Sequence, residues 1–407
     1  MPDAAPAAAP PRLRAARASV AACFFINAVL YADLVPRLPE IKDRLDLTNT
    51  SLGAALAALP LGALVSALAS AALMRRFGSA RVASFGLVAL AAAVWGASVA
   101  PSWWLLAGAL FVAGALDAVV DVAQNAHGLR VQRAYDRSIL NAFHGIWSIG
   151  AVAGGLLGSA AAGLGIPLGL HLGVVAGVFA ALALVAYRSM LPGPDQVEVS
   201  EDALPTGGSG ALRAVLPALA ALGVLAACGA FVEDAGSSWS ALYLRGEIGT
   251  GAATAGLGFV ALSVAMTVGR LTGDRVVDRF GQRRVARVGG AVIAAGMGLA
   301  LAVPSLPTTL VGFALAGLGV ATLVPAVYAA ADDLPGLRHG VGLTLVNWLL
   351  RIGFLASPPL VGAIADASSL RVGLLAVVVA GVATLVCGQV LRATVSRAGR
   401  PGVHPEG

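Results

Sequence analysis

Lysine is almost missing from this chain, and charged residues of both signs are scarce. Lys42 is the only lysine among 407 residues, and Asp, Glu, Lys and Arg together make up 12% of the sequence. A phosphate-binding loop of the type G-x-x-x-x-G-K-[ST] needs a lysine after its second glycine, but Lys42 lies in "IKDRLD". The sequence therefore excludes ATP-driven transport through such a loop, and it predicts no cofactor.

Cysteine and histidine are also few. Cys23, Cys228 and Cys387 all lie in apolar runs, too far apart for a C-x-x-C metal pair. The H-E-x-x-H pattern of membrane metalloproteases is missing as well. We therefore expect neither a metal site nor an enzyme.

Apolar residues are abundant, at 58% of the chain with a mean hydropathy of +0.85. Soluble proteins carry about 25% charged residues, twice the share found here, and a membrane helix needs about 20 apolar residues. The sequence thus predicts an all-α membrane protein of the cell membrane with twelve transmembrane helices. They fall near 18–36, 50–73, 82–100, 103–127, 139–162, 168–188, 214–240, 250–272, 285–303, 308–331, 340–363 and 370–391.

The net charge of +6 follows the topology of these helices. About twenty of the basic residues lie in one set of alternate connections and about five in the other, as the positive-inside rule requires. This distribution places both termini in the cytoplasm. It also removes the reason to expect a nucleic-acid partner.

Matching residues recur at an offset of 203 positions, which indicates that the chain is a repeat of two halves. The matched pairs are Phe77-Gly78 with Phe280-Gly281, Arg81-Val82 with Arg284-Val285, Pro101-Ser102 with Pro304-Ser305, Gly114 with Gly317, and Gly150 with Gly353. Because each half holds six spans, the halves have the same orientation in the membrane and form a parallel repeat. We expect a tail at 1–17, a six-helix bundle at 18–190, a polar cytoplasmic linker at 191–213, a second six-helix bundle at 214–392 and a tail at 393–407.

Two parallel six-helix halves resemble the major facilitator superfamily, whose loop signature is close to G-x-x-x-D-R-x-G-R-R. The C-half segment "GDRVVDRFGQRR" is similar to it, whereas "ASAALMRRFGSAR" in the N-half has Arg75 where the family has an acid. The segments "DVAQNAHG", "FHGIWSIGAVAGG", "SSWSALYLR" and "SPPLVGAIAD" further resemble a bacterial branch described as fucose-permease-like. In the C-half signature loop and the helix before it, the resemblance implies a cytoplasmic gate made of Arg270, Asp274, Asp278, Arg279 and Arg283.

This resemblance implies a monomeric secondary transporter that moves a small organic solute through the bilayer by alternating access. Coupling to protons is the simplest interpretation of its intramembrane acids, and sodium coupling and facilitated diffusion are the alternatives. The segment "GAVAGG" is similar to the antiporter motif G-P-x-x-G-G without its proline, so an exporter of drugs or self-made metabolites is the alternative. A receptor without transport activity on the same scaffold is a third possibility.

The fourth span carries a polar stripe. Asp117, Asp121 and Asn125 follow one another at intervals of four residues and share a helical face. In the second half of the repeat, Val320 and Val324 stand at the positions of Asp117 and Asp121. The scaffold therefore does not require acids there. Two carboxylates one turn apart repel when both are ionised, which suits a proton carrier. The alternative is that Asp121 and Asn125 lie in water near the cytoplasmic mouth.

The fifth span brings His144 to the level of Asp121 if the two spans form an antiparallel hairpin. An imidazole titrates near neutral pH and could relay a proton to the carboxylate. Alternatively, His144 and its counterpart Asn347 are hydrogen-bonding residues between helices.

Further ionisable residues lie within apolar spans and are candidates for substrate or proton binding, because a charge at the bilayer centre costs roughly 2.5–3.5 kcal/mol on insertion scales. Asp33 precedes Pro36 in the first span, and Glu233 and Asp234 are adjacent in the seventh. Asp33 could instead lie at the periplasmic headgroups. Arg351 interrupts the eleventh span near mid-membrane, where we expect either an internal ion pair or an anionic substrate.

Overall fold

A computed structural model describes residues 10–135, 139–193, 209–334 and 341–391. Within these ranges every regular element is a helix, and twelve helical segments are long and apolar enough to cross a membrane. This confirms the predicted all-α fold with twelve spans. Parts of the predicted tails and linker, at 1–9, 194–208 and 393–407, lie outside the described residues.

The N-terminal bundle contains the first six spans. Its elements are α1 (Pro11–Leu34), η1 (Val35–Arg37), α2 (Leu38–Arg44), α3 (Asn49–Phe77), α4 (Ser79–Val99), α5 (Trp103–Tyr135), α6 (Leu140–Gly163) and α7 (Leu168–Tyr187). α1 begins inside the segment predicted as a tail, and η1 and α2 extend it to form one span of 34 residues. Pro11, Pro36 and Pro39 each stand in the first turn of their element, where a missing N–H costs no helical hydrogen bond.

The C-terminal bundle contains the other six spans. Its elements are α8 (Ser209–Gly246), α9 (Ala252–Ala255), α10 (Leu257–Phe280), α11 (Gln282–Ala302), α12 (Leu306–Val320), α13 (Leu323–Asp332), α14 (Val341–Ala367), α15 (Leu370–Gly373), α16 (Leu375–Cys387) and η2 (Gly388–Val390). The tenth span is divided between α12 and α13 at Ala321 and Thr322.

Glycines repeat the same packing in both halves. A Cβ on Gly114 would lie 1.9 Å from the carbonyl oxygen of Leu59, and one on Gly317 would lie 2.2 Å from that of Leu262. Gly114 and Gly317 are 203 positions apart in the sequence, and so are Leu59 and Leu262. Since only glycine permits such close approach of two helices, the repeat read from the sequence is also a repeat of helix contacts.

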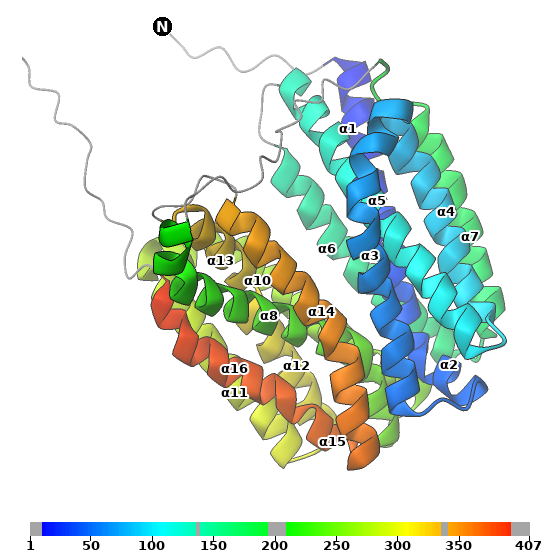
Figure 1. Cartoon of the computed structure of the whole chain (residues 1–407). Helices are drawn as coiled ribbons and strands as arrows, with labels where there is room; N and C mark the ends of the chain where they lie inside the picture. The colour runs from blue at the N-terminus through cyan, green and yellow to red at the C-terminus, as the bar shows by residue number, and fades with distance from the viewer. Residues whose placement is uncertain (1–9, 136–138, 194–208, 335–340, 392–407) are drawn as a thin grey trace, which may run out of the picture.

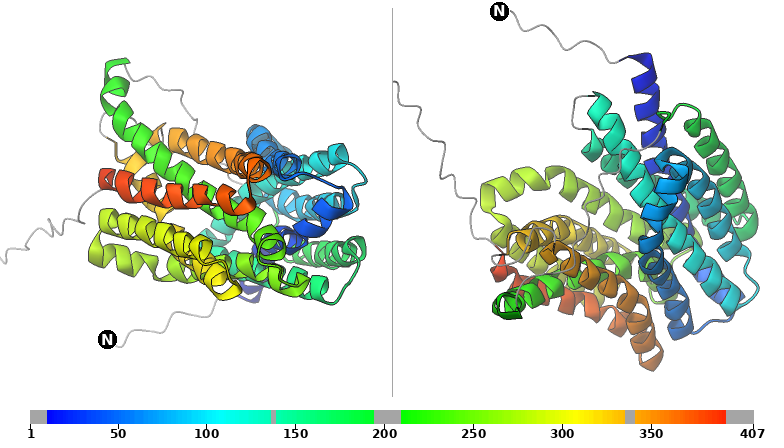
Figure 2. Two further views of the ribbon diagram at one scale, coloured as in Figure 1. Left: turned by 90° about the horizontal axis from the view of Figure 1, so that it is seen from below. Right: turned by 45° about the horizontal axis from the view of Figure 1, so that its top comes forward.

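The two bundles lie against each other at one end and diverge toward the end at which α1 begins (Figure 1). The views in Figure 2 show the same side-by-side arrangement. The most extensive contact between the bundles joins α3 to α14, and α6 packs on α10. We call the end at which α1 begins and α7 ends the linker end, and the opposite end the closed end.

Candidate functional site

A cavity of about 350 Å³ lies between the two bundles, and helices of both bundles line it. Its polar lining consists of Asn27 and Tyr31 of α1, Asp117 of α5, Trp147 of α6, Glu233, Asp234 and Ser237 of α8, and Asn347 and Arg351 of α14. Five of these were predicted from the sequence as candidates: Asp117, Glu233, Asp234, Asn347 and Arg351. The cavity is within the size range of small-molecule sites.

A chain of hydrogen bonds forms the N-bundle wall of the cavity. The Trp147 indole N–H donates to Oδ1 of Asn27 at 2.8 Å, and Nδ2 of Asn27 donates to Oδ1 of Asp117 at 2.7 Å. Asn27 is only 4% exposed, so its amide is held in one orientation by a donor and an acceptor. This arrangement fixes one oxygen of Asp117 and leaves the other without a bond to Asn27.

Asn27, Tyr31 and Trp147 were not among the residues predicted from the sequence. Their signal was weak because an uncharged amide or a ring within an apolar run does not stand out. The polar pattern of "FFINAVLY" was nevertheless available, since Asn27 interrupts an otherwise apolar segment.

Acids on α8 form the opposite wall. Oε2 of Glu233 lies 3.4 Å from NH2 of Arg270, and this ion pair is partly exposed. Oδ1 of Asp234 accepts a hydrogen bond from Ser238 at 3.2 Å. Arg270, predicted as part of a gate, thus contacts a predicted substrate residue.

On α14 the cavity is lined by an amide and a guanidinium one turn apart. Oδ1 of Asn347 accepts a hydrogen bond from the Tyr328 hydroxyl at 2.8 Å. Arg351 is half-buried, and among the described residues it makes neither a hydrogen bond nor an ion pair. The internal ion pair considered for Arg351 is therefore not formed in this conformation.

Asp33 is fully buried between α1 and α7, outside the lining of the central cavity. Nε2 of His171 lies 3.3 Å from its Oδ1. Arg37, itself 1% exposed, contacts Nδ1 of His171 at 3.1 Å and also binds Glu40 and the carbonyl oxygen of Ile166, both at 2.7 Å. Because arginine only donates, Nδ1 accepts and Nε2 of the neutral ring carries the proton, without a hydrogen bond to Asp33 in this conformation. Asp33 is thus enclosed by protein, and its depth in the membrane stays a prediction.

The remaining candidates of the polar stripe lie nearer the linker end. Asp121 is exposed, and its Oδ1 accepts a hydrogen bond from Asn125 at 3.0 Å. The ring of His144 packs edge-on against Phe24, with centroids 5.2 Å apart. Within the described part of the chain no hydrogen bond joins Asp121 to His144, so this conformation does not contain the expected relay.

The predicted gate residues of the C-half loop are mostly at the surface. Asp274, Asp278 and Arg279 are exposed. Nε of Arg283 donates to the carbonyl oxygen of Leu391 at 2.8 Å, which ties the start of α11 to the end of the last span. The gate itself remains a prediction.

Contacts between the bundles gather at the closed end. The Asp366 carboxylate on α14 accepts hydrogen bonds from the backbone N–H groups of Asn49 and Thr50 at the start of α3, at 2.9 and 2.7 Å. Arg245 of α8 pairs with Asp43 of α2 at 3.0 Å. These contacts join the two bundles at the closed end.

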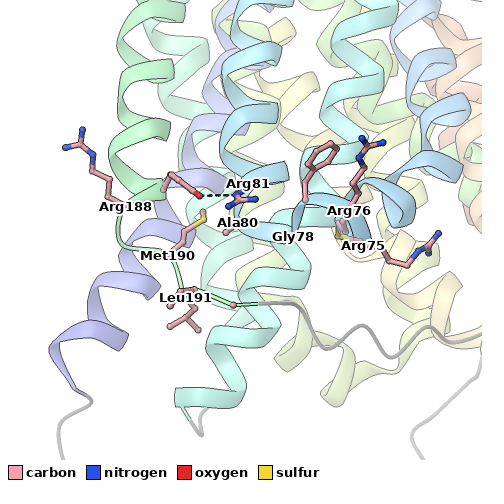
Figure 3. A pocket seen from close by; sticks show the side chains of 13 residues that line it. Arg75, Arg76, Gly78, Ala80, Arg81, Arg188, Met190 and Leu191 are labelled. Atoms are coloured by element: carbon pink, nitrogen blue, oxygen red, sulfur yellow. Dashed lines mark hydrogen bonds between the residues drawn. The ribbon is translucent and has the colours of Figure 1, made fainter.

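A second, basic cavity lies at the linker end of the N-terminal bundle, between the α3–α4 turn and the end of α7. Figure 3 shows the side chains of Arg75, Arg76 and Arg188 pointing in different directions, while Arg81 is directed toward Tyr187. Nε of Arg81 donates to the Tyr187 hydroxyl at 3.4 Å. Because the guanidinium groups do not converge on one point, we do not assign this cavity to the transported solute.

In the described ranges no group of three or more His, Cys, Asp and Glu side chains could hold a metal ion.

Comparison with known proteins gives the class of the protein. A family model described as Major Facilitator Superfamily matches residues 20–233 and 219–406. The "Uncharacterized transporter y4wD" of Sinorhizobium fredii is 31% identical over 375 residues, covering 90% of this chain and 97% of that protein.

Solved structures agree in fold. A bacterial homologue of the human lysosomal transporter Spinster, inward-facing and unoccupied, has a TM-score of 0.74 at 15% identity and covers 96% of this chain and 100% of that one. The Escherichia coli fucose:proton symporter has a TM-score of 0.61 at 17% identity, covering 92% and 97%.

Twelve spans in two repeated bundles around a central cavity define a secondary transporter of small solutes, a multi-pass protein of the cell membrane. The chain belongs to the Major Facilitator Superfamily. The family resemblance read from the signature loops is thereby confirmed.

Proposed function

We propose that this protein is a proton-coupled transporter of a small polar organic solute, which binds in the central cavity and crosses by alternating access. The observation that carries the proposal is the cavity itself. It lies between the two bundles, and both contribute charged side chains that the apolar scaffold does not need. A charge persists at membrane depth when it faces a water-filled cavity or a partner.

The linker end faces the cytoplasm in this proposal, because about twenty basic residues lie in the connections of that end and about five at the other. Both termini are then cytoplasmic, and the conformation is open to the inside. Opening the other side requires the contacts of Asp366 and Arg245 to break while the bundles rock around the bound solute.

Proton coupling rests on acids that are held in place within the membrane. Asp117 lines the cavity and is positioned by Asn27, and Asp33 is buried beside His171. Asp121 and His144 lie nearer the linker end, where they could pass protons between the cavity and water. The solved relative described as a fucose:proton symporter agrees with this mechanism, although that similarity is one of fold.

Proteoliposomes with a pH-sensitive dye inside test this proposal. We expect one or more solutes from a panel of sugars, organic acids and drugs to cause acidification or alkalinisation of the lumen. In Asp117→Asn the amide oxygen still accepts from Asn27 while the titratable proton is lost, so we expect solute-linked proton movement to stop. Asp121→Asn removes an acid of the same helix that lies outside the cavity lining, and we expect it to slow proton movement without stopping it. Solute flux with no proton movement in the unchanged protein contradicts coupling.

The exporter alternative receives little support from the glycines of "GAVAGG". A Cβ on Gly150 would lie 2.7 Å from the carbonyl oxygen of Phe25, and one on Gly154 would lie 2.7 Å from that of Val29. These glycines therefore pack α6 on α1.

The proteoliposome assay also gives the direction of transport. Measurement of the protein's mass in nanodiscs tests the expected monomer.

A further inference from the structure

Arg351 lines the cavity without a direct hydrogen-bond or ion-pair partner among the described residues, although Asp121 is close enough to interact with its charge. Each cavity acid has a partner: Asp117 binds Asn27, Asp234 binds Ser238, and Glu233 is paired with Arg270. In the described part of the chain Arg351 has no such partner. Burial without an opposite charge is costly for a guanidinium.

The scaffold does not explain this arginine. In the repeat its counterpart is Ser148, whose hydroxyl donates to the carbonyl oxygen of His144 within the same helix at 3.1 Å. The corresponding position in the N-half thus needs no charge. Glu233, an acid of the same cavity, is already paired with Arg270, with 3.4 Å between Oε2 of Glu233 and NH2 of Arg270. Among the described residues no carboxylate lies within ion-pair distance of Arg351, so its guanidinium is open to an anionic group of a bound solute.

We propose that the transported solute carries a single carboxylate, that Arg351 binds this carboxylate, and that hydroxyl or amino groups of the solute donate to Asp117. This inference rests on the proposed function and specifies its substrate class. A guanidinium presents parallel N–H donors that match the two oxygens of a carboxylate. Asp117 lines the same cavity and has an oxygen that Asn27 does not use.

The charge of the cavity limits the solute to one negative group. Asp117, Glu233 and Asp234 all line it, and they would repel a dianion such as a phosphate monoester or a dicarboxylate. Tyr31 and Trp147 supply flat apolar surface beside Asp117, against which the carbon skeleton packs. The cavity volume of about 350 Å³ suits a small hydroxy or amino acid.

Binding to the purified protein in nanodiscs tests the class with three sets of compounds that differ mainly in one terminal group. They are gluconate, sorbitol and glucamine; glycolate, ethylene glycol and ethanolamine; and hydroxybenzoate, hydroxybenzyl alcohol and hydroxybenzylamine. We expect the acid of at least one set to bind more tightly than its alcohol and its amine by about tenfold to a hundredfold, as for a charge-assisted hydrogen bond.

Substitutions assign the effect to Arg351. Arg351→Gln should remove the preference for the acid over the alcohol, and Arg351→Lys should retain part of it. Arg287→Gln is the control, because Arg287 is outside the cavity and donates to the carbonyl oxygen of Leu385. Melting curves exclude loss of fold. An unchanged preference in Arg351→Gln overturns the proposal, as does tighter binding of alcohols or amines or no binding of any acid.

The two proposals fail separately. Acid binding that depends on Arg351, without solute-linked proton movement in liposomes, would contradict proton coupling and leave the substrate class intact. Proton-coupled flux of solutes that carry no carboxylate would contradict the substrate class and leave the transport function intact.

Discussion

The carboxylate of Asp366 accepts a hydrogen bond from the backbone N–H of Thr50 at 2.7 Å, which joins the end of α14 to the first turn of α3. A second bond from Asn49 uses the other oxygen. An acid at a helix N-terminus contributes about 0.3–1 kcal/mol when exposed. The counterpart of Asp366 in the repeat is Gly163, which packs on Ala253. Only one of the two equivalent contacts between the bundles therefore carries the charge.

Removing this charge should favour opening of the closed end. For Asp366→Asn we expect the open fraction to rise about two- to fivefold, the equivalent of about 0.5–1 kcal/mol. Spin labels at Leu164 and Val303, both exposed and in different bundles, would report the distance distribution. Asp46→Asn changes an exposed acid at the same end whose side chain contacts no residue of the other bundle in the described part of the chain, and it should leave the distribution unchanged. A rise of equal size in both variants would speak against the capping contact.

Glycine substitutions on α5 should differ sharply. Gly114→Ala places a methyl group against the carbonyl oxygen of Leu59, and we expect a loss of about 1–3 kcal/mol from overpacking. Gly108→Ala on the same helix meets nothing within 4 Å and should be neutral or slightly stabilising. Apparent melting temperatures in detergent measure both. Equal melting temperatures would mean that the close approach of α3 and α5 is not required.

The buried Arg37 network should matter far more for stability than a surface ion pair. Arg37→Gln leaves Asp33 and His171 without the neighbouring guanidinium. Removing one charged partner from a buried network lowers the free energy of unfolding by about 3–5 kcal/mol. Arg245→Gln breaks an exposed pair with Asp43 and should cost about 0–1 kcal/mol. Denaturant titration followed by circular dichroism compares the two variants. Similar losses would show that the network contributes no more than a surface pair.

The hydrogen bonds of Asn27 should control transport through Asp117. Asn27→Ala removes both bonds of the chain, so we expect solute flux to be lost. Trp147→Phe keeps an aromatic ring and removes only the indole donor, and it should reduce flux several-fold. Flux into proteoliposomes at matched protein content is the measurement. A larger loss in Trp147→Phe than in Asn27→Ala would show that the ring, and not the oriented amide, is decisive.

The sequence was sufficient for the fold because membrane spans are a property of local composition. The repeat was readable because helix packing depends on single small residues, as Gly114 and Gly317 show by meeting equivalent carbonyl oxygens. Helix boundaries were less accurate. α1 begins at Pro11 and not near residue 18, because polar and arginine-containing turns extend a helix beyond the apolar run that identifies it.

The site was predicted only in part because its partners come from distant segments. Asp117 was recognisable as an acid in an apolar span, but its partner Asn27 is 90 residues away and uncharged. The expected contact of Asp121 with His144 assumed a regular hairpin of two helices. Asp366 gave no signal at all, since its partners are backbone groups of the other bundle.

Alternating access requires one cavity that opens first to one side of the membrane and then to the other. Its most direct test is thiol labelling of Ala63→Cys, which lines the cavity, in a protein whose Cys23, Cys228 and Cys387 are replaced by alanine. Val65→Cys is the control, because Val65 is 58% exposed on the opposite face of α3. With a membrane-impermeant reagent we predict rapid labelling of Ala63→Cys in inside-out vesicles and slow labelling in right-side-out vesicles. Transported solute should accelerate the labelling in right-side-out vesicles. Equal labelling of both cysteines, or labelling of Ala63→Cys from one side under all conditions, would contradict alternating access.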